Sequence, residues 1–257
     1  MTTATENAIE VRGLRAAYGD NVILQNIGFS VRRGEVFVIL GGSGCGKSTL
    51  MKFMIGLYRP TAGEILIGGE DIARAEGADY LRILRRFGVM YQSGALFGSL
   101  TVRENVKLPL DVFTRLPEQA KQMIVLLKLR LVGLEQAIDK LPSELSGGMI
   151  KRAAIARAMA LDPEILFLDE PSAGLDPVSS ASLDDLINYL SASLGITFVV
   201  VTHELPSIYA IADRVIMLDK NTKTIIAEGP PERLRDQDQN PLVRQFFNRK
   251  PAAGTIP

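Results

Sequence analysis

The sequence contains very little cysteine and histidine: its 257 residues include one cysteine, Cys45, and one histidine, His203. A single cysteine excludes an intrachain disulfide, which fits a reducing compartment. His203 follows an apolar run that ends at Val201. By itself this position allows two interpretations, an imidazole of the core or a partner for a charged ligand.

An excess of charge is also missing, because 29 Lys and Arg residues balance 29 Asp and Glu residues. Broad nucleic-acid binding usually needs a basic excess, so we expect no nucleic-acid partner. No apolar run approaches the roughly 18 residues that cross a bilayer. The first residues, MTTATENAIEV, lack the basic and apolar pattern of a secretory signal. If the protein acts at a membrane, we expect another chain to supply the membrane-spanning part.

Short apolar runs alternate with segments of helical spacing, which indicates an α/β protein with a parallel sheet. Strands covered on both faces are almost continuously apolar, and three runs have this character: VFVIL at 36–40, ILFL at 165–168 and ITFVVV at 196–201. The segments AIEVRGLRAAYG, ILQNIGFSVRRGE and GEILIGGEDI alternate more and predict an antiparallel β layer near the N-terminus. Near the C-terminus, RVIMLDKNTKTIIAEG predicts a hairpin.

The region from about residue 102 to residue 161 has no strand pattern and predicts a helical subdomain inserted into the α/β core. Four of its residues follow helical spacing and are expected to pack in the core: Ile124, Leu127, Leu131 and Leu134. The last segment, RKPAAGTIP, is predicted to be disordered.

The segment GGSGCGKST at 41–49 matches the phosphate-binding pattern G-x-x-x-x-G-K-[ST] in full. A predicted strand precedes it and a predicted helix follows it, which is the required order. Glycines let main-chain N–H groups approach a phosphate, and the helix adds its positive end. Lys47 supplies a charge for the β- and γ-phosphates, and Ser48 offers a hydroxyl to Mg²⁺. The predicted nucleotide-binding residues of this loop are Gly41, Gly42, Ser43, Gly44, Cys45, Gly46, Lys47, Ser48 and Thr49.

Two acidic residues, Asp169 and Glu170, come directly after a predicted buried strand. Ligands of open α/β sheets bind outside the carboxyl ends of the strands. In that position Asp169 can bind Mg²⁺, and Glu170 can orient and deprotonate an attacking water. The alternative is a pair of solvated acids at a strand exit, since Asp-Glu alone is a weak pattern.

The segment LSGGM at 145–149 places two glycines at the start of a predicted helix. Ser146, Gly147 and Gly148 there offer N–H groups and a positive helix end to a second anion. With this segment in place, the chain from about residue 9 to residue 229 resembles the ATP-binding cassette (ABC) ATPases. The remaining motifs of that family follow in order: an aromatic residue at Tyr18, the Q-loop glutamine Gln92, the D-loop at 173–176 and the switch histidine His203.

The resemblance implies an α/β fold: a P-loop NTPase (RecA-like) core with an antiparallel β layer and an inserted α-helical subdomain. It also implies one domain over residues 1–257. The core would take up about 5–92 and 160–230, the helical subdomain about 93–159, and a C-terminal extension about 231–257.

The resemblance further implies a head-to-tail homodimer with two ATP molecules between the subunits. Ser146, Gly147 and Gly148 of one subunit would then face the γ-phosphate bound by the other. The family motif usually ends in Gln, and this sequence has Met149 instead. Because the serine and the glycine amides face the phosphate, we expect turnover to survive this difference.

Other roles also come from the resemblance alone. Tyr18 would stack on adenine, Gln92 would contact Mg²⁺ or the attacking water, and Asp176 would link the two sites of the dimer. His203 would contact the γ-phosphate, which answers the question that its position raises. The implied catalytic residues are Lys47, Glu170 and His203. The implied metal ligands are Ser48, Gln92 and Asp169.

Within the ABC family, three segments are similar to the ATPases of Mla/Mce-type lipid transporters: YQSGALFGSLTVRENV at 91–106, PSELSGGMIKRAAIARA at 142–158 and NPLVRQFF at 240–247. The similarity implies an ATPase at the cytoplasmic face of the inner (plasma) membrane that powers lipid, in particular phospholipid, transport. Its implied partners are integral membrane permeases, a periplasmic lipid-binding Mce-type protein and a small regulatory subunit. The alternative is a soluble ABC ATPase of an assembly or scaffold system without a transport role.

In ABC ATPases the surface after the Q-loop receives a permease helix. Leu96, Phe97 and Leu100 could line such a groove here, or they could fill the core of the helical subdomain.

Overall fold

The computed structural model describes residues 7–237 and 239–249. The chain forms two compact units. The first unit joins Met1–Ala73 to Val201–Pro257, and the second is Arg74–Val200. The second unit is therefore inserted, along the chain, between the two parts of the first.

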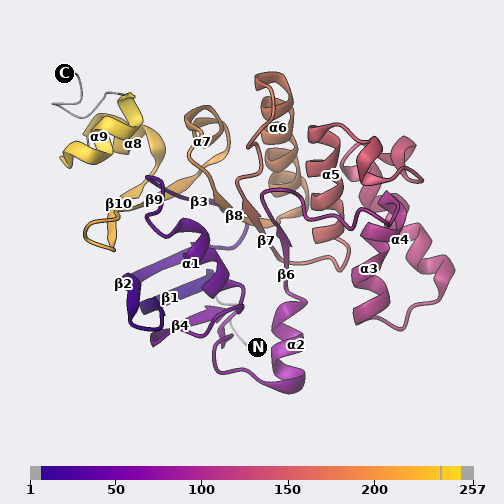
Figure 1. Ribbon diagram of the computed structural model, residues 1–257, viewed down its shortest axis with the longest axis horizontal. Coiled ribbons are helices and arrows are strands. Elements are labelled where there is room, and N and C mark those ends of the chain that lie inside the picture. The colour runs from indigo at the N-terminus through magenta and orange to yellow at the C-terminus, as the bar shows by residue number, and fades with distance from the viewer. Residues whose placement is uncertain (1–6, 238, 250–257) are drawn as a thin grey trace. The chain divides into compact units, whose positions relative to one another are not determined.

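The first unit begins with an antiparallel sheet, as the sequence predicts. It contains β1 (Asn7–Tyr18), β2 (Asn21–Arg32), β4 (Ala62–Ile67) and β5 (Glu70–Asp71), in the order β2-β1-β4-β5. The first three strands of this order are labelled in Figure 1. Val11 of β1 lies opposite Phe29 of β2, and both side chains are buried. The alternation of buried and exposed residues along these strands turns one apolar face of the sheet into the core.

The remaining strands confirm the predicted parallel pairing and the predicted hairpin. In the first unit, β3 (Val36–Gly41) lies parallel to β9 (Arg214–Leu218), which pairs antiparallel with β10 (Ile225–Gly229). In the second unit, β6 (Phe87–Met90) lies parallel to β7 (Ile165–Asp169), and β8 (Thr197–Val201) is the next strand in the order. Every residue of β3, β7 and β8 is buried, as their continuous apolar runs predict.

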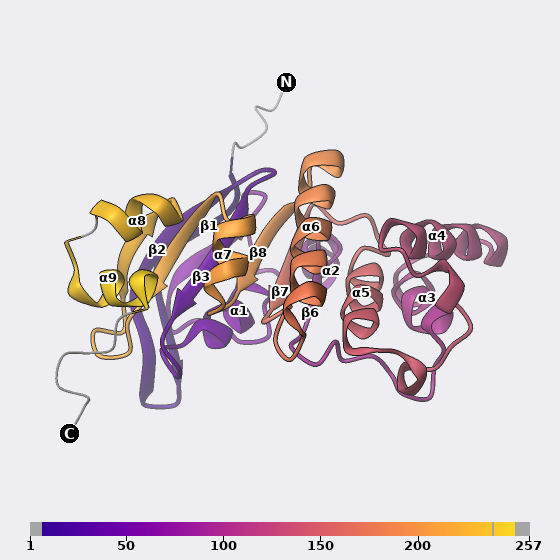
Figure 2. The same ribbon diagram turned by 90° about the horizontal axis from the view of Figure 1, so that it is seen from above.

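The C-terminal helices of the first unit pack as a pair. This unit contains α1 (Lys47–Met54), α7 (Leu205–Ile211), α8 (Pro231–Gln237) and α9 (Pro241–Asn248). Helices α8 and α9 lie side by side in both views (Figures 1 and 2). Val243 and Phe247 of α9 are buried, and Arg249 is the C-cap of the helix. The rest of the tail that was predicted to be disordered, residues 250–257, lies outside the described residues.

The second unit is mainly helical between its first and second strands. Its helices are α2 (Gly77–Leu84), α3 (Val102–Phe113), α4 (Glu118–Leu131), α5 (Gly147–Ala158) and α6 (Pro177–Leu194), with short 3-10 turns η1 (Glu135–Ala137) and η2 (Pro142–Glu144). No strand occurs from residue 102 to residue 161, as predicted. None of the described helices has both the length and the hydrophobicity needed to cross a bilayer.

The predicted core positions of α4 are partly wrong. Leu127 is 54% exposed, and Ile124 and Leu131 are only half-buried. Leu134 is buried, but it lies beyond the end of the helix. The fully buried apolar side chains of this segment are Val125, Leu129 and Val132. The segment is apolar at so many positions that helical spacing does not select a single face, and tertiary packing decides which face is buried.

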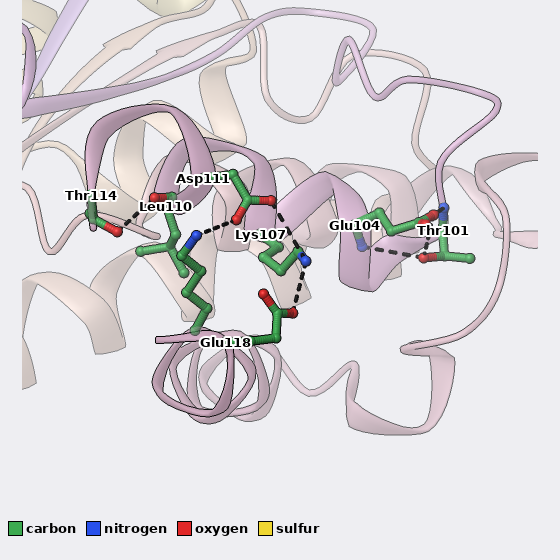
Figure 3. A network of polar contacts seen from close by, with 8 residues as sticks. Thr101, Glu104, Lys107, Leu110, Asp111, Thr114 and Glu118 are labelled. Atoms are coloured by element: carbon green, nitrogen blue, oxygen red, sulfur yellow. Dashed lines mark hydrogen bonds and ion pairs between the residues drawn. The ribbon is translucent and has the colours of Figure 1, made fainter. Parts of the chain in front are cut away.

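Polar side chains connect α3 with α4 (Figure 3). The ammonium of Lys107 lies 2.8 Å from a carboxylate oxygen of Glu118, and that of Lys121 lies 2.6 Å from Asp111. The hydrogen bond from Lys121 lowers the pKa of Asp111, and the one from Lys107 lowers the pKa of Glu118. A single exposed ion pair adds little to the free energy of unfolding. The main effect of this network is therefore to determine that these two helices pair.

A capping box begins α3. The Thr101 hydroxyl accepts a hydrogen bond from the main-chain N–H of Glu104 at 3.2 Å, and the Glu104 carboxylate accepts one from the N–H of Thr101 at 2.7 Å. Two main-chain donors that no helical carbonyl can reach are satisfied in this way. The second bond lowers the pKa of Glu104.

We expect Thr101→Ala to lower the free energy of unfolding by about 1 kcal/mol, because it removes the oxygen that caps α3. Thr101→Ser keeps that oxygen and should cost much less. Urea denaturation of the two variants and the parent chain measures both effects. An alanine variant as stable as the parent would contradict the role of this cap.

Candidate functional site

The predicted phosphate loop lies between β3 and α1 of the first unit, and its conformation requires glycine. Gly41 has φ 148°. A Cβ on Gly41 would come within 2.5 Å of the Leu218 carbonyl oxygen and 2.6 Å of the Cys45 sulfur. Gly42, Ser43 and Gly44 are exposed, so the tip of the loop faces solvent.

Helix α1 starts from this loop without a side-chain cap. Its N-cap is Gly46, with φ 103°, and no side chain of the cap residue accepts a hydrogen bond there. Lys47, Ser48 and Thr49 form the first turn, whose N–H groups have no acceptor within the helix. The positive end of a helix, framed by a loop that faces solvent, is suited to a phosphate.

The charge of Lys47 is held against the same loop. Its ammonium donates hydrogen bonds to the carbonyl oxygens of Gly41 at 2.9 Å and Gly42 at 3.3 Å. The side chain therefore folds back over the loop from which it projects. This arrangement places a full positive charge beside the N-terminus of α1, where the sequence predicts it.

Cys45 lies beneath the loop and is 2% exposed. Burial raises the pKa of its thiol. Since the thiolate is the reactive form of cysteine, these features disfavour a redox role. Cys45 is a small residue that fills the space under the loop.

His203, another predicted site residue of the first unit, lies shortly after the end of a strand. The main-chain N–H of Thr202 donates to the carbonyl of Ile39 at 3.3 Å, so Thr202 lies beside the end of β3, just before the phosphate loop. His203 is the next residue and is exposed. The lone histidine is thus a surface residue near the phosphate loop, which contradicts its interpretation as a core imidazole.

Tyr18 ends β1 and belongs to an aromatic cluster. Its ring is 39% exposed and meets Tyr58 edge-on, with ring centroids 5.1 Å apart. The ring of Phe53, on α1, lies 6.2 Å away. A half-exposed ring supported by two others is a suitable platform for a planar base.

The second unit brings Gln92, Asp169 and Glu170 to one sheet edge. Met90 of β6 pairs with Leu168 of β7, so Gln92 and Glu170 each follow a paired residue by two positions. Asp169 is 9% exposed and Gln92 is exposed. Glu170 has φ 47°, a left-handed conformation that is uncommon for any residue except glycine. An acidic residue whose main chain is held in an uncommon conformation is typical of an active site.

Sequence reasoning missed Lys151, which contacts this edge. It lies on α5, is 5% exposed, and donates hydrogen bonds to the carbonyl oxygens of Gln92 and, at 3.3 Å, Glu170. Its neighbours on the buried face of α5 are alanines and an isoleucine. A lysine within an apolar helix face is the one sequence feature that could have indicated it.

The predicted second anion site lies at the start of α5. Ser146 is the N-cap, and its hydroxyl accepts from the N–H of Met149 at 3.4 Å. Ser146 and Gly147 are exposed. A cavity of about 260 Å³ adjoins them, and Ser146, Gly148 and Met149 are among its lining residues. Met149 therefore faces the same space as the serine and does not fill the core.

Asp176 is engaged within its own chain as the N-cap of α6. Its carboxylate accepts from the N–H groups of Val178 and Ser179, each at 3.0 Å, and from the Ser179 hydroxyl. The hydroxyl bond, with the N–H bonds, lowers the pKa of Asp176. The carboxylate is thus held ionised and in a fixed orientation.

The predicted metal ligands, Ser48, Gln92 and Asp169, suit Mg²⁺ by their chemistry. They are a hydroxyl, an amide and a carboxylate, and Mg²⁺ prefers few protein oxygens supplemented by phosphates and water. Among the described residues, no group of three or more His, Cys, Asp or Glu side chains is arranged so that it could hold a metal ion. The donor set therefore fits a cation that arrives with a nucleotide rather than one held by the protein alone.

An apolar groove of about 320 Å³, which we call the Phe97 groove, lies in the second unit. Its apolar lining includes Leu84, Phe87, Phe97, Leu108, Val112 and Phe113. Phe97 is 53% exposed and Val112 is 66% exposed. Of the three residues considered for such a groove, Phe97 lines it, whereas Leu96 and Leu100 are half-buried outside it.

Buried Asn105 fixes the segment that carries Phe97. Its side-chain oxygen accepts from the N–H of Phe97 at 2.8 Å, and its amide donates to the carbonyls of Phe97 at 3.1 Å and Leu100 at 3.0 Å. The segment is therefore preorganised, and its aromatic side chain is displayed from a fixed backbone.

Comparison with known proteins identifies the family. A family model described as ABC transporter matches residues 24–173. Over 242 residues the chain is 42% identical to the intermembrane phospholipid transport system ATP-binding protein MlaF of Haemophilus influenzae, covering 94% of this chain and 90% of the relative. Over 241 residues it is 44% identical to the "Probable ribonucleotide transport ATP-binding protein mkl" of Mycobacterium leprae, covering 94% of this chain and 69% of the relative.

Solved structures agree with this family. CbiO1 of Clostridium perfringens, part of the ABC transporter complex cbiONQ, matches with a TM-score of 0.82 at 31% identity, covering 90% of this chain and 92% of that one. The ATP-binding cassette MJ0796, a dimer in a post-hydrolysis state bound to ADP and Pi, matches with a TM-score of 0.78 at 30% identity, covering 86% and 98%. These matches confirm the predicted fold class. The family model spans more than half of the chain, and the chain therefore belongs to the ABC transporter family, as one of its ATP-binding cassettes.

Proposed function

We propose that this chain is the ATP-hydrolysing subunit of a transporter that moves phospholipid through partner permeases. The observation that supports ATP binding most directly is the start of α1, which has no side-chain cap and lies beside Lys47, because a helix N-terminus and a positive charge both suit a phosphate. Phospholipid as the cargo rests on the similarity to a protein named for phospholipid transport. Mass spectrometry of the lipids that co-purify with the tagged complex tests the cargo, and a complex without phospholipid would contradict it.

In the proposed reaction, a water oxygen attacks the γ-phosphorus as the bond to the bridging β–γ oxygen breaks. Glu170 accepts the proton of the water, and ADP leaves with the bridging oxygen. Lys47 and the main-chain N–H groups of the loop hold the phosphates and stabilise the charge that develops. His203 contacts the γ-phosphate and helps to orient the water.

Cofactor binding is assigned as follows. Ser48, Gln92 and Asp169 would hold Mg²⁺, whose chemistry is to neutralise charge on the β- and γ-phosphates. Tyr18 would stack on adenine. Its partial exposure and its aromatic support favour that role.

The functional form is proposed to be a head-to-tail homodimer. Ser146, Gly147 and Gly148 of one subunit would complete the phosphate site of the other, and Asp176 would link the two sites. The exposure of Ser146 and Gly147 supports a role that needs a second subunit. We further propose that the chain is a single cassette domain, with a core at about 5–92 and 160–230, a helical subdomain at about 93–159 and a C-terminal extension from about 231.

The Phe97 groove is proposed to receive a helix of the permease. A permease helix with apolar residues facing the groove would cover Phe97 and Val112, which are otherwise exposed. Through this contact the cassette would be held at the cytoplasmic face of the inner (plasma) membrane. A periplasmic lipid-binding Mce-type protein and a small regulatory subunit complete the proposed assembly.

Lys47 and Glu170 are expected to separate binding from chemistry. Lys47→Ala should weaken ATP binding at least ~10-fold, because it removes a charge from the phosphate site. Glu170→Gln should leave the ATP dissociation constant within about 2-fold while lowering kcat at least ~100-fold, because the amide cannot accept the proton. Equilibrium binding of a fluorescent ATP analogue and a phosphate-release assay measure the two effects. Turnover at the parent rate in Glu170→Gln would exclude Glu170 as the base.

Phe97→Ser should reduce recovery of the permease with the tagged cassette, because it places a hydroxyl where an apolar contact is proposed. Met123→Ser is a matched control, since Met123 is 74% exposed on α4 and does not line the groove. Basal ATP hydrolysis by the isolated cassette should be unchanged in both variants. Equal permease recovery with Phe97→Ser and Met123→Ser would contradict docking at the groove.

A further inference from the structure

Lys151 is a buried cation that contacts the sheet edge formed by Gln92, Asp169 and Glu170, which we call the catalytic edge. Its side chain is 5% exposed, and it donates to the carbonyl oxygens of Gln92 and, at 3.3 Å, Glu170. A buried ammonium is destabilising unless acceptors surround it. The carbonyls of Gln92 and Glu170 meet that need, and in return their positions are fixed by a rigid helix.

These contacts reach the main-chain carbonyls of the two residues. Gln92 and Glu170 each lie two residues after a member of the Met90–Leu168 pair, which joins two adjacent parallel strands. One ammonium therefore holds the two strand exits together at the point where the sheet hydrogen bonds stop. Glu170 leaves its strand in a left-handed conformation, φ 47°, which its surroundings have to maintain.

Helix α5 is well placed to act as the support. At Gly88, on β6, a Cβ would come within 2.0 Å of the Ala158 carbonyl oxygen, so the end of α5 packs directly on the strand that precedes Gln92. Arg157, near that end, donates to the carbonyls of Gly94 at 2.8 Å and Ala95 at 2.6 Å. The loop after β6 is thus held by α5 at two places.

We propose that Lys151 is a positioning residue for ATP hydrolysis. It sets the main chain from which the side chains of Gln92 and Glu170 project, and it does so from the helix that Ser146 begins. A shift of α5 would therefore move the start of this helix and the catalytic edge together. The inference rests on the proposed role of Glu170 as the base.

A purely structural role for a buried lysine makes different predictions, and the chain offers a matched control. Lys128, on α4, is also buried, at 4% exposure, and its ammonium pairs with Asp162. It has no observed contact with Gln92 or Glu170. Lys151→Met and Lys128→Met each remove one buried charge at similar volume.

We expect Lys151→Met to lower kcat at least ~10-fold in the full-length chain, with the ATP dissociation constant within about 2-fold of the parent. Lys128→Met should keep kcat within about 2-fold, whatever its loss of thermal stability. Lys151→Arg keeps the cationic donors and should recover part of kcat. If Lys151→Met does not fold, Lys151→Gln replaces it in the same comparison, since an amide retains donors but not the charge.

Glu170→Gln is measured in parallel, so that failure of the positioning role of Lys151 can be distinguished from failure of the proposed function. An unchanged kcat in Lys151→Met, together with a lost kcat in Glu170→Gln, would overturn the positioning role and leave the proposed function intact. Equal loss of kcat in Lys151→Met and Lys128→Met would also overturn it, because a general structural effect would then suffice. Turnover at the parent rate in Glu170→Gln would remove the proposed base and, with it, the basis of the inference.

Discussion

The start of α1 is the constraint on which the proposed nucleotide site depends: N–H groups at a helix end need acceptors, and the cap residue of α1 offers no side-chain acceptor. Thr101, Asp176 and Asn240 cap α3, α6 and α9 with side-chain oxygens. At α1 the cap is Gly46, which has no side chain to offer. Other helices, such as α2 and α4, also lack a side-chain cap. Unlike α1, however, they do not follow a glycine-rich loop and do not begin with a lysine. The combination at α1 is what suits this helix end to a phosphate.

Much of this arrangement could be predicted from the sequence, because each part is determined locally. The apolar runs fix β3, β7 and β8, and the motif spacing fixes the loop that follows β3. The buried face of α4 could not be predicted, since residues 123–127 are all apolar and only the packed partner distinguishes them. The same limit applies to Phe97, which lines its groove while Leu96 and Leu100 do not.

In the site, too, some features could be predicted from the local sequence and others only from the tertiary structure. Asp169 and Glu170 are evident from their place after a strand, but the left-handed backbone of Glu170 is not. The contacts of Lys151 are harder still to predict from the sequence, because the acceptors observed are main-chain carbonyls 59 and 19 residues away along the chain. A main-chain acceptor has no residue type, so no motif can predict it. Only the fold shows which carbonyls a buried cation will meet.

The Phe97 groove and the catalytic edge share one supporting helix, and this bears on how a cassette can serve different cargoes. Arg157 of α5 lines the groove and holds Gly94 and Ala95, while Lys151 of the same helix holds Gln92 and Glu170. The two relatives are nearly equally similar to this chain, yet their names state different cargoes. Such a pattern is expected if the cassette contacts nucleotide and permease and the cargo meets only the other chains. If the groove receives a permease helix, as proposed, α5 would connect that contact with the residues proposed for the phosphate chemistry.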